Sequence, residues 1–443
     1  MTAETPSAPN ARRGLRSVAL LAVVVALASF ALHTANLIYR ARADGCESAL
    51  LLCRNAKGAW GSSVGDYKDY LAVALDIVYA GGVTNFWKVP YYRRTPGYPL
   101  LMVLTYDATG MFTPVHWVGP IAAAGAGAAV VGLGFALGGR RSAILAGILF
   151  CLWLSAYRYS ADMRTDAPHA FAAVMAVAAS LAWKRTERGG FAGLAAALWM
   201  ATQALRPTLF GIAAILPVLL FKRGVDRRYL IASGALLAST LVMPAFVIGS
   251  NAIRYGTPVA SEIATRNLAC YAVPRMMAQL GHAPFDEMRD RCLKRFRAIP
   301  REDRARMQTA WAIGAFRLHP WPALRSFAGE LSVQMFAGIE LSPYAKYQPS
   351  WLRAGAGFMA VYWICVLAGL FVTARRERGT AIFAALFVLL VMLPATSSHY
   401  VGNRLRLPVD ILCIPFAAVF VETAARNAIR WRRRQVAKGA VAR

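Results

Sequence analysis

Charged residues are scarce in this chain, and acidic ones are the scarcer kind. Only 16% of the 443 residues are charged, with 22 Asp and Glu against 50 Lys and Arg, whereas 57% are hydrophobic. A soluble protein of this length has room for a large core, but it does not carry repeated apolar runs of bilayer length. The composition therefore indicates a polytopic membrane protein and excludes an ordinary soluble domain.

About ten apolar segments are expected to form transmembrane helices, which predicts an all-α fold. The segments lie near residues 17–38, 114–138, 142–157, 167–183, 190–205, 207–221, 229–249, 354–374, 380–395 and 407–423. The first is not expected to be a cleaved signal, because its apolar run, 18–32, leads into the polar residues 33–36 without a small-residue cleavage site. No internal repeat or low-complexity linker divides the chain.

A net charge of +28 is typical of proteins that bind nucleic acid, but the placement of the basic residues argues against that partner. They form short clusters beside the ends of predicted helices, at Arg12, Arg13, Arg16; Arg140, Arg141; Lys184, Arg185, Arg188; Lys222, Arg223, Arg227, Arg228; Arg375, Arg376, Arg378; and the tail after Glu422. This positive-inside pattern predicts cytoplasmic termini in an inner (plasma) membrane. The tail is expected to touch anionic lipid.

Two segments, about 39–113 and 250–353, are too long and too polar to span, and the topology places both on the outer (periplasmic) side. The prediction is one membrane domain, 1–425, with two elaborated outer loops, followed by a basic cytoplasmic tail, 426–443. Cys46 and Cys53 lie in the first loop, and Cys270 and Cys292 lie in the second. Each pair is compatible with a disulfide or with free thiols. No Cys/His cluster has zinc spacing, so no metal or other cofactor is predicted, although a divalent ion is not incompatible with the chain.

The first outer loop carries the most informative pattern. Asp66, Tyr70 and Ala74 recur at a spacing of four, which places them on one face of a helix that begins near Asp66 and ends at Gly81-Gly82. Asp66 can serve as the helix N-cap, as a reactive carboxylate, or as both.

Two arginines follow in the same loop. Arg93 and Arg94 precede Pro96-Gly97-Tyr98-Pro99, a turn that redirects the chain towards the membrane. At headgroup depth a guanidinium can bind a lipid phosphate with two hydrogen bonds. The alternative is an interfacial arginine whose head group simply reaches water.

The order of five short motifs resembles that of the GT-C glycosyltransferases that use polyprenyl-phosphate sugars, such as protein mannosyltransferases and lipid A aminoarabinose transferases. The motifs are Asp66-x3-Tyr70-x3-Ala74, the Arg-Arg-Thr-Pro-Gly-Tyr-Pro stretch 93–99, residues 158–168 with Asp162 and Asp166, residues 204–208 around Arg206, and residues 404–408 with Arg404. The resemblance covers residues 15–425. It departs from the family at the first motif, where a paired acid is common but Asp66-Tyr67 stands here and the next acid is Asp69.

The resemblance implies an inverting sugar transfer from a lipid-linked donor to a lipid, glycan or protein acceptor on the outer face of the inner membrane. It assigns the base to Asp66, with Asp162 and Asp166 as further catalytic carboxylates. The lipid phosphate would be held by Tyr70, Arg93, Arg94, Arg206 and Arg404. These residues share the outer side of the predicted topology, where ionisable groups at membrane depth are usually functional.

Two other classes compete with this interpretation. A transporter or lipid-linked glycan flippase is less favoured because no inverted repeat or broken midplane helix is evident. A ligase that joins whole polysaccharides would share the arginines but centres on a long outer loop. His169 is expected to pack or cap a helix, and His399 is expected to lie in a solvated loop.

Overall fold

The structure, a computed structural model, describes residues 8–43, 65–89, 91, 94–161, 165–336, 349–397 and 404–441. Within these ranges the backbone is mostly helical and contains no strand. The elements are α1 (Ala8–Ala43), α2 (Gly65–Tyr79), η1 (Val83–Lys88), α3 (Gly97–Thr109), η2 (Thr113–Trp117), α4 (Val118–Gly138), α5 (Arg140–Cys151), α6 (Leu154–Ser160), α7 (Asp166–Thr186), α8 (Gly189–Leu205), η3 (Pro207–Leu209), α9 (Ile212–Leu220), α10 (Arg227–Tyr255), α11 (Glu262–Asn267), η4 (Leu268–Ala272), α12 (Val273–Gln279), α13 (Phe285–Arg297), α14 (Arg301–Leu318), α15 (Pro320–Phe336), α16 (Pro349–Ala374), α17 (Arg378–Ala395) and α18 (Leu407–Val441).

The prediction of an all-α polytopic membrane protein is confirmed, with fewer full-length spans than the ten expected. Each of the ten predicted segments falls on helical structure. In the described part of the chain, six helices are long and apolar enough to cross a membrane, and a bent pair, α5 with α6, would make a seventh. The six contain the predicted first, second, seventh, eighth, ninth and tenth segments.

The predicted span 142–157 is broken rather than continuous. α5 and α6 meet at a bend of 52°. Trp153 leaves the helix at this point, with φ −79° and ψ 86°, and its buried indole packs 4.8 Å from the ring of Tyr362. The carbonyl of Cys151, freed by the break, accepts a hydrogen bond from the hydroxyl of Tyr157. Satisfying that carbonyl inside the bundle makes the break tolerable at membrane depth.

The predicted span 207–221 is too short to cross. Its helical core, α9, has 9 residues, about 14 Å at 1.5 Å per residue, against a hydrocarbon core of about 30 Å. The adjoining helix η3 is a separate 3₁₀ turn that starts at Pro207. α8 is a shorter apolar helix of 17 residues, and α7 is buried along nearly its whole length between its neighbours. α7 therefore lies in the interior of the bundle, whereas α8 and α9 each bury one face.

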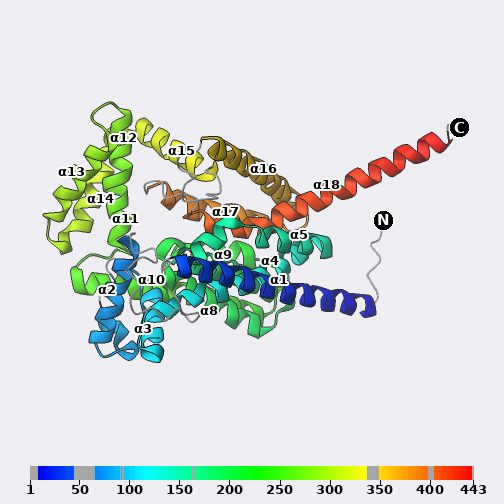
Figure 1. The fold of residues 1–443 in the computed structure, drawn as a ribbon, viewed down its shortest axis with the longest axis horizontal. Helices are drawn as coiled ribbons and strands as arrows, with labels where there is room; N and C mark the ends of the chain where they lie inside the picture. Colours follow the sequence, from blue (N-terminus) through cyan, green and yellow to red (C-terminus); the bar gives the residue numbers. More distant parts are fainter. Residues whose placement is uncertain are drawn as a thin grey trace.

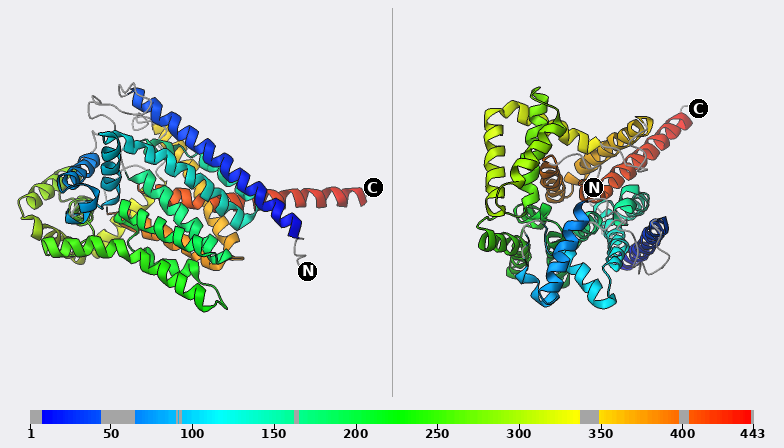
Figure 2. Two further views of the ribbon diagram at one scale, coloured as in Figure 1. Left: turned by 90° about the horizontal axis from the view of Figure 1, so that it is seen from below. Right: turned by 60° about the vertical axis from the view of Figure 1, so that its left-hand side comes forward.

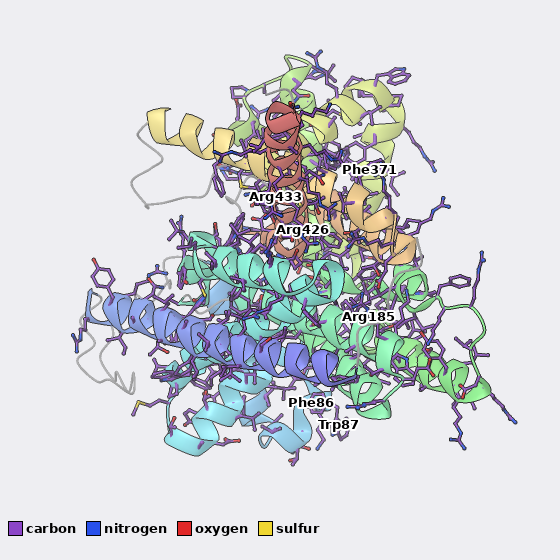
Figure 3. The ribbon with its side chains drawn as sticks, turned by 90° about the vertical axis from the view of Figure 1, so that its right-hand side faces the viewer. Phe86, Trp87, Arg185, Phe371, Arg426 and Arg433 are labelled. Carbon is purple, nitrogen blue, oxygen red and sulfur yellow. A yellow bond between two sulfur atoms is a disulfide. The ribbon has the colours of Figure 1, made fainter. Side chains whose placement is uncertain are left out.

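The molecule has two chemically different ends. Figure 1 shows α2, α3 and α11–α14 at the end opposite the two termini, and Figure 2 shows the same separation from below. Arg185, Arg426 and Arg433 lie at the terminal end, which faces the viewer in Figure 3. There Arg185 pairs with Glu377, and Lys222 pairs with Glu187. α18 continues without interruption through the predicted tail.

The second predicted outer loop is a small helical bundle. Helices α11–α15 and η4 pack around a core that includes Val273, Met276 and Phe296. A disulfide joins Cys270 and Cys292, so this pair is not two free thiols. Cys46 and Cys53 lie outside the described residues.

A polar contact ties this outer bundle to α17. Arg275 pairs with Glu330 at 2.9 Å and donates to the carbonyl of Thr396, while the amide of Gln334 donates to the carbonyl of Ala395 at 2.9 Å. Burial lowers the pKa of Arg275, and the Glu330 carboxylate opposes that shift. The bundle is therefore anchored at the end of α17.

The first outer segment also docks onto the bundle. α2 begins and ends as predicted, followed by Gly81 and Gly82 in left-handed conformations with φ 99° and 87°. At Gly97, an added Cβ would lie 2.7 Å from the carbonyl carbon and oxygen of Ala204. Only glycine permits this approach, so the Pro-Gly-Tyr-Pro turn places α3 directly against the chain that leads to Arg206.

Candidate functional site

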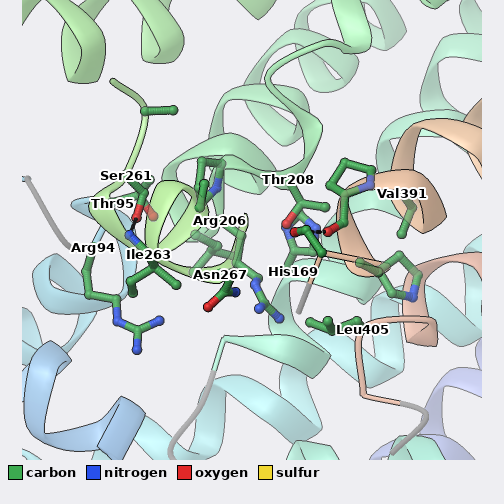
Figure 4. Close-up of a pocket in the computed structure, with 18 of the residues that line it drawn as sticks. Arg94, Thr95, His169, Arg206, Thr208, Ser261, Ile263, Asn267, Val391 and Leu405 are labelled. Carbon is green, nitrogen blue, oxygen red and sulfur yellow. Dashed lines mark hydrogen bonds between the residues drawn. The ribbon is translucent and has the colours of Figure 1, made fainter. Parts of the chain in front are cut away.

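A cavity of about 230 Å³ opens where the first outer segment, α11 and the end of α17 meet the membrane helices. We call it the polar cavity, because its lining includes two arginines, a histidine and several hydroxyl and amide side chains. Its polar lining residues are Tyr70, Arg94, Thr95, His169, Arg206, Thr208, Ser261, Asn267 and Ser397. Figure 4 shows these side chains converging from helices that are far apart in sequence.

One carboxylate holds two arginines at the wall of this cavity. Asp166 accepts from Nη1 of Arg206 and pairs with Nε of Arg404 at 2.8 Å. The Asp166 side chain has no exposed surface, and those of Arg206 and Arg404 are 15% and 11% exposed. One negative and two positive charges leave a net positive charge at the site. We call these three residues the Asp166 cluster.

The local sequence explains how the cluster forms. The residue before a proline favours extended backbone, and Arg206 has φ −153° and ψ 142° ahead of Pro207. α8 therefore ends at Leu205, and Arg206 leaves the helix axis. Asp166 occupies the first turn of α7, where a carboxylate is favoured by the helix dipole. Arg404 lies in the turn that precedes α18.

A second group of residues forms the rim. The Tyr70 hydroxyl lies 2.8 Å from Oγ1 of Thr165, next to Asp166 in the chain. Arg94 stacks on the Tyr70 ring, 4.7 Å from its centroid, and pairs with Asp69 at 3.2 Å. We call Asp69 and Arg94 the rim pair. Because Tyr70 contacts both Arg94 and Thr165, it connects the rim pair with the Asp166 cluster.

The structure thus brings together five of the predicted site residues: Tyr70, Arg94, Asp166, Arg206 and Arg404. Asp66 is the second residue of α2, at the helix start where it was expected, but its side chain lies outside the described structure. Asp162, Arg93 and His399 lie outside the described residues altogether. Asp166 itself does not line the cavity, since its carboxylate is covered by the two arginines.

The sequence did not separate the two arginines of Arg404-Leu-Arg406. Arg406 is 1% exposed and pairs with Asp410, one helical turn later, at 2.8 Å. It also donates to the carbonyl oxygens of Gln334 and Met335 at the end of α15. Arg406 therefore fixes the start of α18, while Arg404 turns to the site. The acid four residues after Arg406 was the available signal.

A second cavity adjoins the first. It has a volume of about 690 Å³, and most of its lining is aliphatic or aromatic, with Leu324, Phe327, Leu331 and Leu393 among its residues. We call it the apolar cavity. It shares Ala264, Pro394 and Ser397 with the polar cavity, so the two adjoin at α11 and the end of α17.

Chemically, the site offers fixed cations beside an apolar surface, an arrangement that suits an anion carried on a hydrophobic chain. Among the described residues, no three His, Cys, Asp or Glu side chains are grouped as metal ligands would be. The described groups therefore provide anion binding and hydrogen bonding.

The fold has counterparts among solved structures. No protein-family model matches the chain, and no curated protein matches it in sequence. The archaeal oligosaccharyltransferase AglB from Archaeoglobus fulgidus, in complex with an inhibitory peptide and a dolichol-phosphate, matches with a TM-score of 0.51 and 13% identity over 95% of this chain and 52% of that one. The apo form of the Archaeoglobus fulgidus oligosaccharyltransferase matches with a TM-score of 0.50 and 12% identity, again over 95% of this chain and 52% of that one. The chain spans about half the length of these proteins. Its fold is thus similar to that of a GT-C glycosyltransferase.

Proposed function

We propose that this protein is a membrane glycosyltransferase that transfers a sugar from a polyprenyl-phosphate donor to an acceptor at the outer face of the membrane, with inversion. The observation that carries the proposal is the Asp166 cluster, a fixed group of cations that opens into the polar cavity beside an apolar one. The similarity in fold to an oligosaccharyltransferase whose structure was solved in complex with a dolichol-phosphate supports it.

The donor phosphate is assigned to Arg206 and Arg94, which both line the polar cavity. Arg93 is assigned the same role from the sequence motif alone. Arg404 contributes charge from behind Asp166. As the bond to the sugar breaks, negative charge grows on the phosphate, and cations already in place stabilise it without rearranging. Asp166 is assigned the positioning of the two arginines, because its own carboxylate is covered.

The donor's hydrocarbon chain is assigned to the apolar cavity. This cavity adjoins the polar one at Pro394, so a donor whose phosphate lies at Arg206 has the apolar lining around Leu393 and Phe327 next to it. Burial of apolar surface contributes about 25 cal/mol per Å², which suits a long prenyl chain.

The acceptor is assigned to two carboxylates, Asp66 in the first outer loop and Asp162 in the segment between α6 and α7. In the proposed step, the acceptor oxygen attacks the anomeric carbon and its proton passes to Asp66. The bond between that carbon and the phosphate oxygen breaks, and the phosphate keeps the electron pair. A carboxylate of ordinary basicity acts here mainly by orienting the hydroxyl.

The proposed orientation follows the charge distribution, with the basic end and both termini in the cytoplasm. Cysteines introduced at exposed Met307 and Val436 should then react with an impermeant thiol reagent from opposite sides of the membrane. Reaction of Met307→Cys from the cytoplasmic side alone would contradict the orientation.

The activity is tested with purified protein in proteoliposomes and a panel of undecaprenyl-phosphate sugars, with mass identification of the product. Asp66→Asn is the sharpest variant, because Asn has nearly the size and shape of Asp but does not accept the proton. If Asp66 is the base, the rate should fall by roughly two to four orders of magnitude. Asp69→Asn is the matched control. A folded Asp66→Asn protein with near-normal transfer moves the assignment to Asp162.

A further inference from the structure

His169 is the single imidazole among the described residues that line the polar cavity. It lies in the first turn of α7, three residues after Asp166, and its side chain is 1% exposed. Its electrostatic interactions with Arg206 and Asp166 place it beside the Asp166 cluster. Figure 4 shows it in the middle of the cavity, between Thr208 and Leu405.

One contact defines the state of this ring. Nδ1 of His169 lies 3.0 Å from the carbonyl oxygen of Thr202, near the end of α8. A carbonyl only accepts hydrogen bonds, so Nδ1 carries the hydrogen and donates it. In the neutral ring Nε2 is then an acceptor. The bond to α8 fixes the direction in which that acceptor points.

Nε2 has no hydrogen-bond partner among the described residues. An unsatisfied buried acceptor costs about 1–3 kcal/mol, which is a reason to expect a donor from elsewhere. The neighbouring Arg206 directs Nη1 to Asp166 instead. The charged groups of the cavity, Arg94 and Arg206, are donors that suit a phosphate, whereas His169 offers a fixed acceptor that suits an O–H group.

We propose that Nε2 of His169 accepts a hydrogen bond from a hydroxyl of the donor sugar and so helps to select that sugar. This assignment rests on the proposed function, because it takes the phosphate to lie at Arg206. The sugar is bonded directly to that phosphate, so its hydroxyls are the groups of the ligand nearest to His169. A site that hydrogen-bonds a substrate hydroxyl rejects analogues without it, because its own polar group is then left unpaired.

Two substitutions separate this role from simple helix packing. In His169→Asn, the side-chain amide nitrogen takes the place of Nδ1 and still donates to Thr202, but the acceptor at Nε2 is gone. In His169→Gln, the side-chain oxygen reaches the place of Nε2, but the bond to Thr202 is lost. If His169 only packs, His169→Asn should impair the protein less than His169→Gln. If His169 binds the sugar, His169→Gln should impair sugar binding less than His169→Asn.

The test measures binding of bare undecaprenyl phosphate and of undecaprenyl phosphate linked to glucose, mannose, galactose or arabinose, after thermal unfolding has confirmed that each variant is folded. For the best-bound sugar lipid, His169→Asn should lose roughly 10- to 100-fold in affinity. Its affinity for the bare lipid phosphate should be unchanged. His169→Gln should retain part of the preference for the sugar.

Three outcomes would overturn the inference: unchanged affinity of His169→Asn for every sugar lipid, equal losses for bare and sugar-linked lipid, or a change confined to the KM of the acceptor. The last outcome would show that Nε2 of His169 binds a hydroxyl of the acceptor and not of the donor sugar. Failure of the wild-type protein to bind bare undecaprenyl phosphate would instead count against the proposed function. The two failures are therefore distinguishable.

Discussion

The Asp166 cluster and the rim pair are both ion pairs at one cavity, but their surroundings differ. The Asp166 carboxylate has no exposed surface and contacts two guanidinium groups, one of them at 2.8 Å. The Asp69 carboxylate is 22% exposed and contacts one guanidinium at 3.2 Å. The guanidinium of Arg94 also stacks on the ring of Tyr70, whereas Arg206 and Arg404 each pair with one oxygen of the Asp166 carboxylate.

The difference separates a fixed part of the site from an adjustable one. Buried charges interact strongly and are costly to leave unpaired, so the Asp166 cluster keeps its geometry whether or not a ligand is bound. In the rim pair the Arg94 side chain is only 10% exposed, but the Asp69 carboxylate is 22% exposed and makes a single contact, so water and salt reach the acid. Arg94 can therefore exchange Asp69 for a phosphate and keep its guanidinium paired.

The largest effect is expected for Asp166→Ala. Removing the shared carboxylate leaves two guanidinium groups poorly compensated inside the protein, and breaking such a buried pair typically costs about 3–5 kcal/mol. Unfolding in detergent, followed by tryptophan fluorescence, should show this loss. Asp69→Asn, measured alongside, should lose less stability, because it breaks a single contact at 3.2 Å with a partly solvated acid. Equal losses of stability from the two substitutions would contradict the distinction between the Asp166 cluster and the rim pair.

An intermediate effect is expected for Arg206→Gln, measured as affinity for undecaprenyl phosphate. Losing a charge-assisted contact should cost about 1.5–3 kcal/mol, or roughly 10- to 100-fold in affinity. Stability should change less than in Asp166→Ala, because Asp166 retains Arg404. Arg206→Lys keeps the charge but not the planar fork, so it should fall between Gln and wild type. Wild-type affinity in Arg206→Gln would exclude this arginine from phosphate binding.

The smallest effect is expected for Arg94→Ala. Its affinity for the same lipid phosphate should fall by no more than about tenfold, since the lost interaction is partly exposed. The loss should shrink further between 50 and 500 mM salt, over which range the Debye length falls from roughly 14 to 4 Å. The loss in Arg206→Gln should persist over the same range. A salt-independent loss in Arg94→Ala would show that this arginine also acts in a desolvated setting.

Much of the fold was predictable because the local composition of the sequence is enough to identify membrane helices. Apolar runs, basic flanks and the Gly81-Gly82 stop are all short-range signals, and the structure confirms the helices they indicate. The prediction of a span at 207–221 was wrong because Pro207 and Gly211 interrupt the apolar segment, so that only α9 forms a regular helix. The break at Trp153 depends on packing against Tyr362, more than 200 residues later, which local composition does not record.

The site was predictable in its charged members and not in its arrangement. Motifs that combine arginine or aspartate with a proline up to four residues later pointed to Asp166, Arg206 and Arg404, but not to the burial of the acid between the two arginines. His169 looked like a packing residue because its significance depends on Thr202, 33 residues away on another helix. A hydrogen bond between residues that only the tertiary structure brings together produces no pattern in the local sequence.

The rigidity of the Asp166 cluster has a consequence for turnover. On the proposed reaction, the sugar lipid enters as a phosphodiester with one negative charge, and the carrier leaves as a phosphomonoester whose second ionisation has a pKa near 6. Cations that cannot move apart hold the more highly charged species more tightly. The spent carrier would then inhibit the enzyme, and its escape into the bilayer would limit the rate. Catalysis would be fastest where another enzyme removes the carrier as it is released.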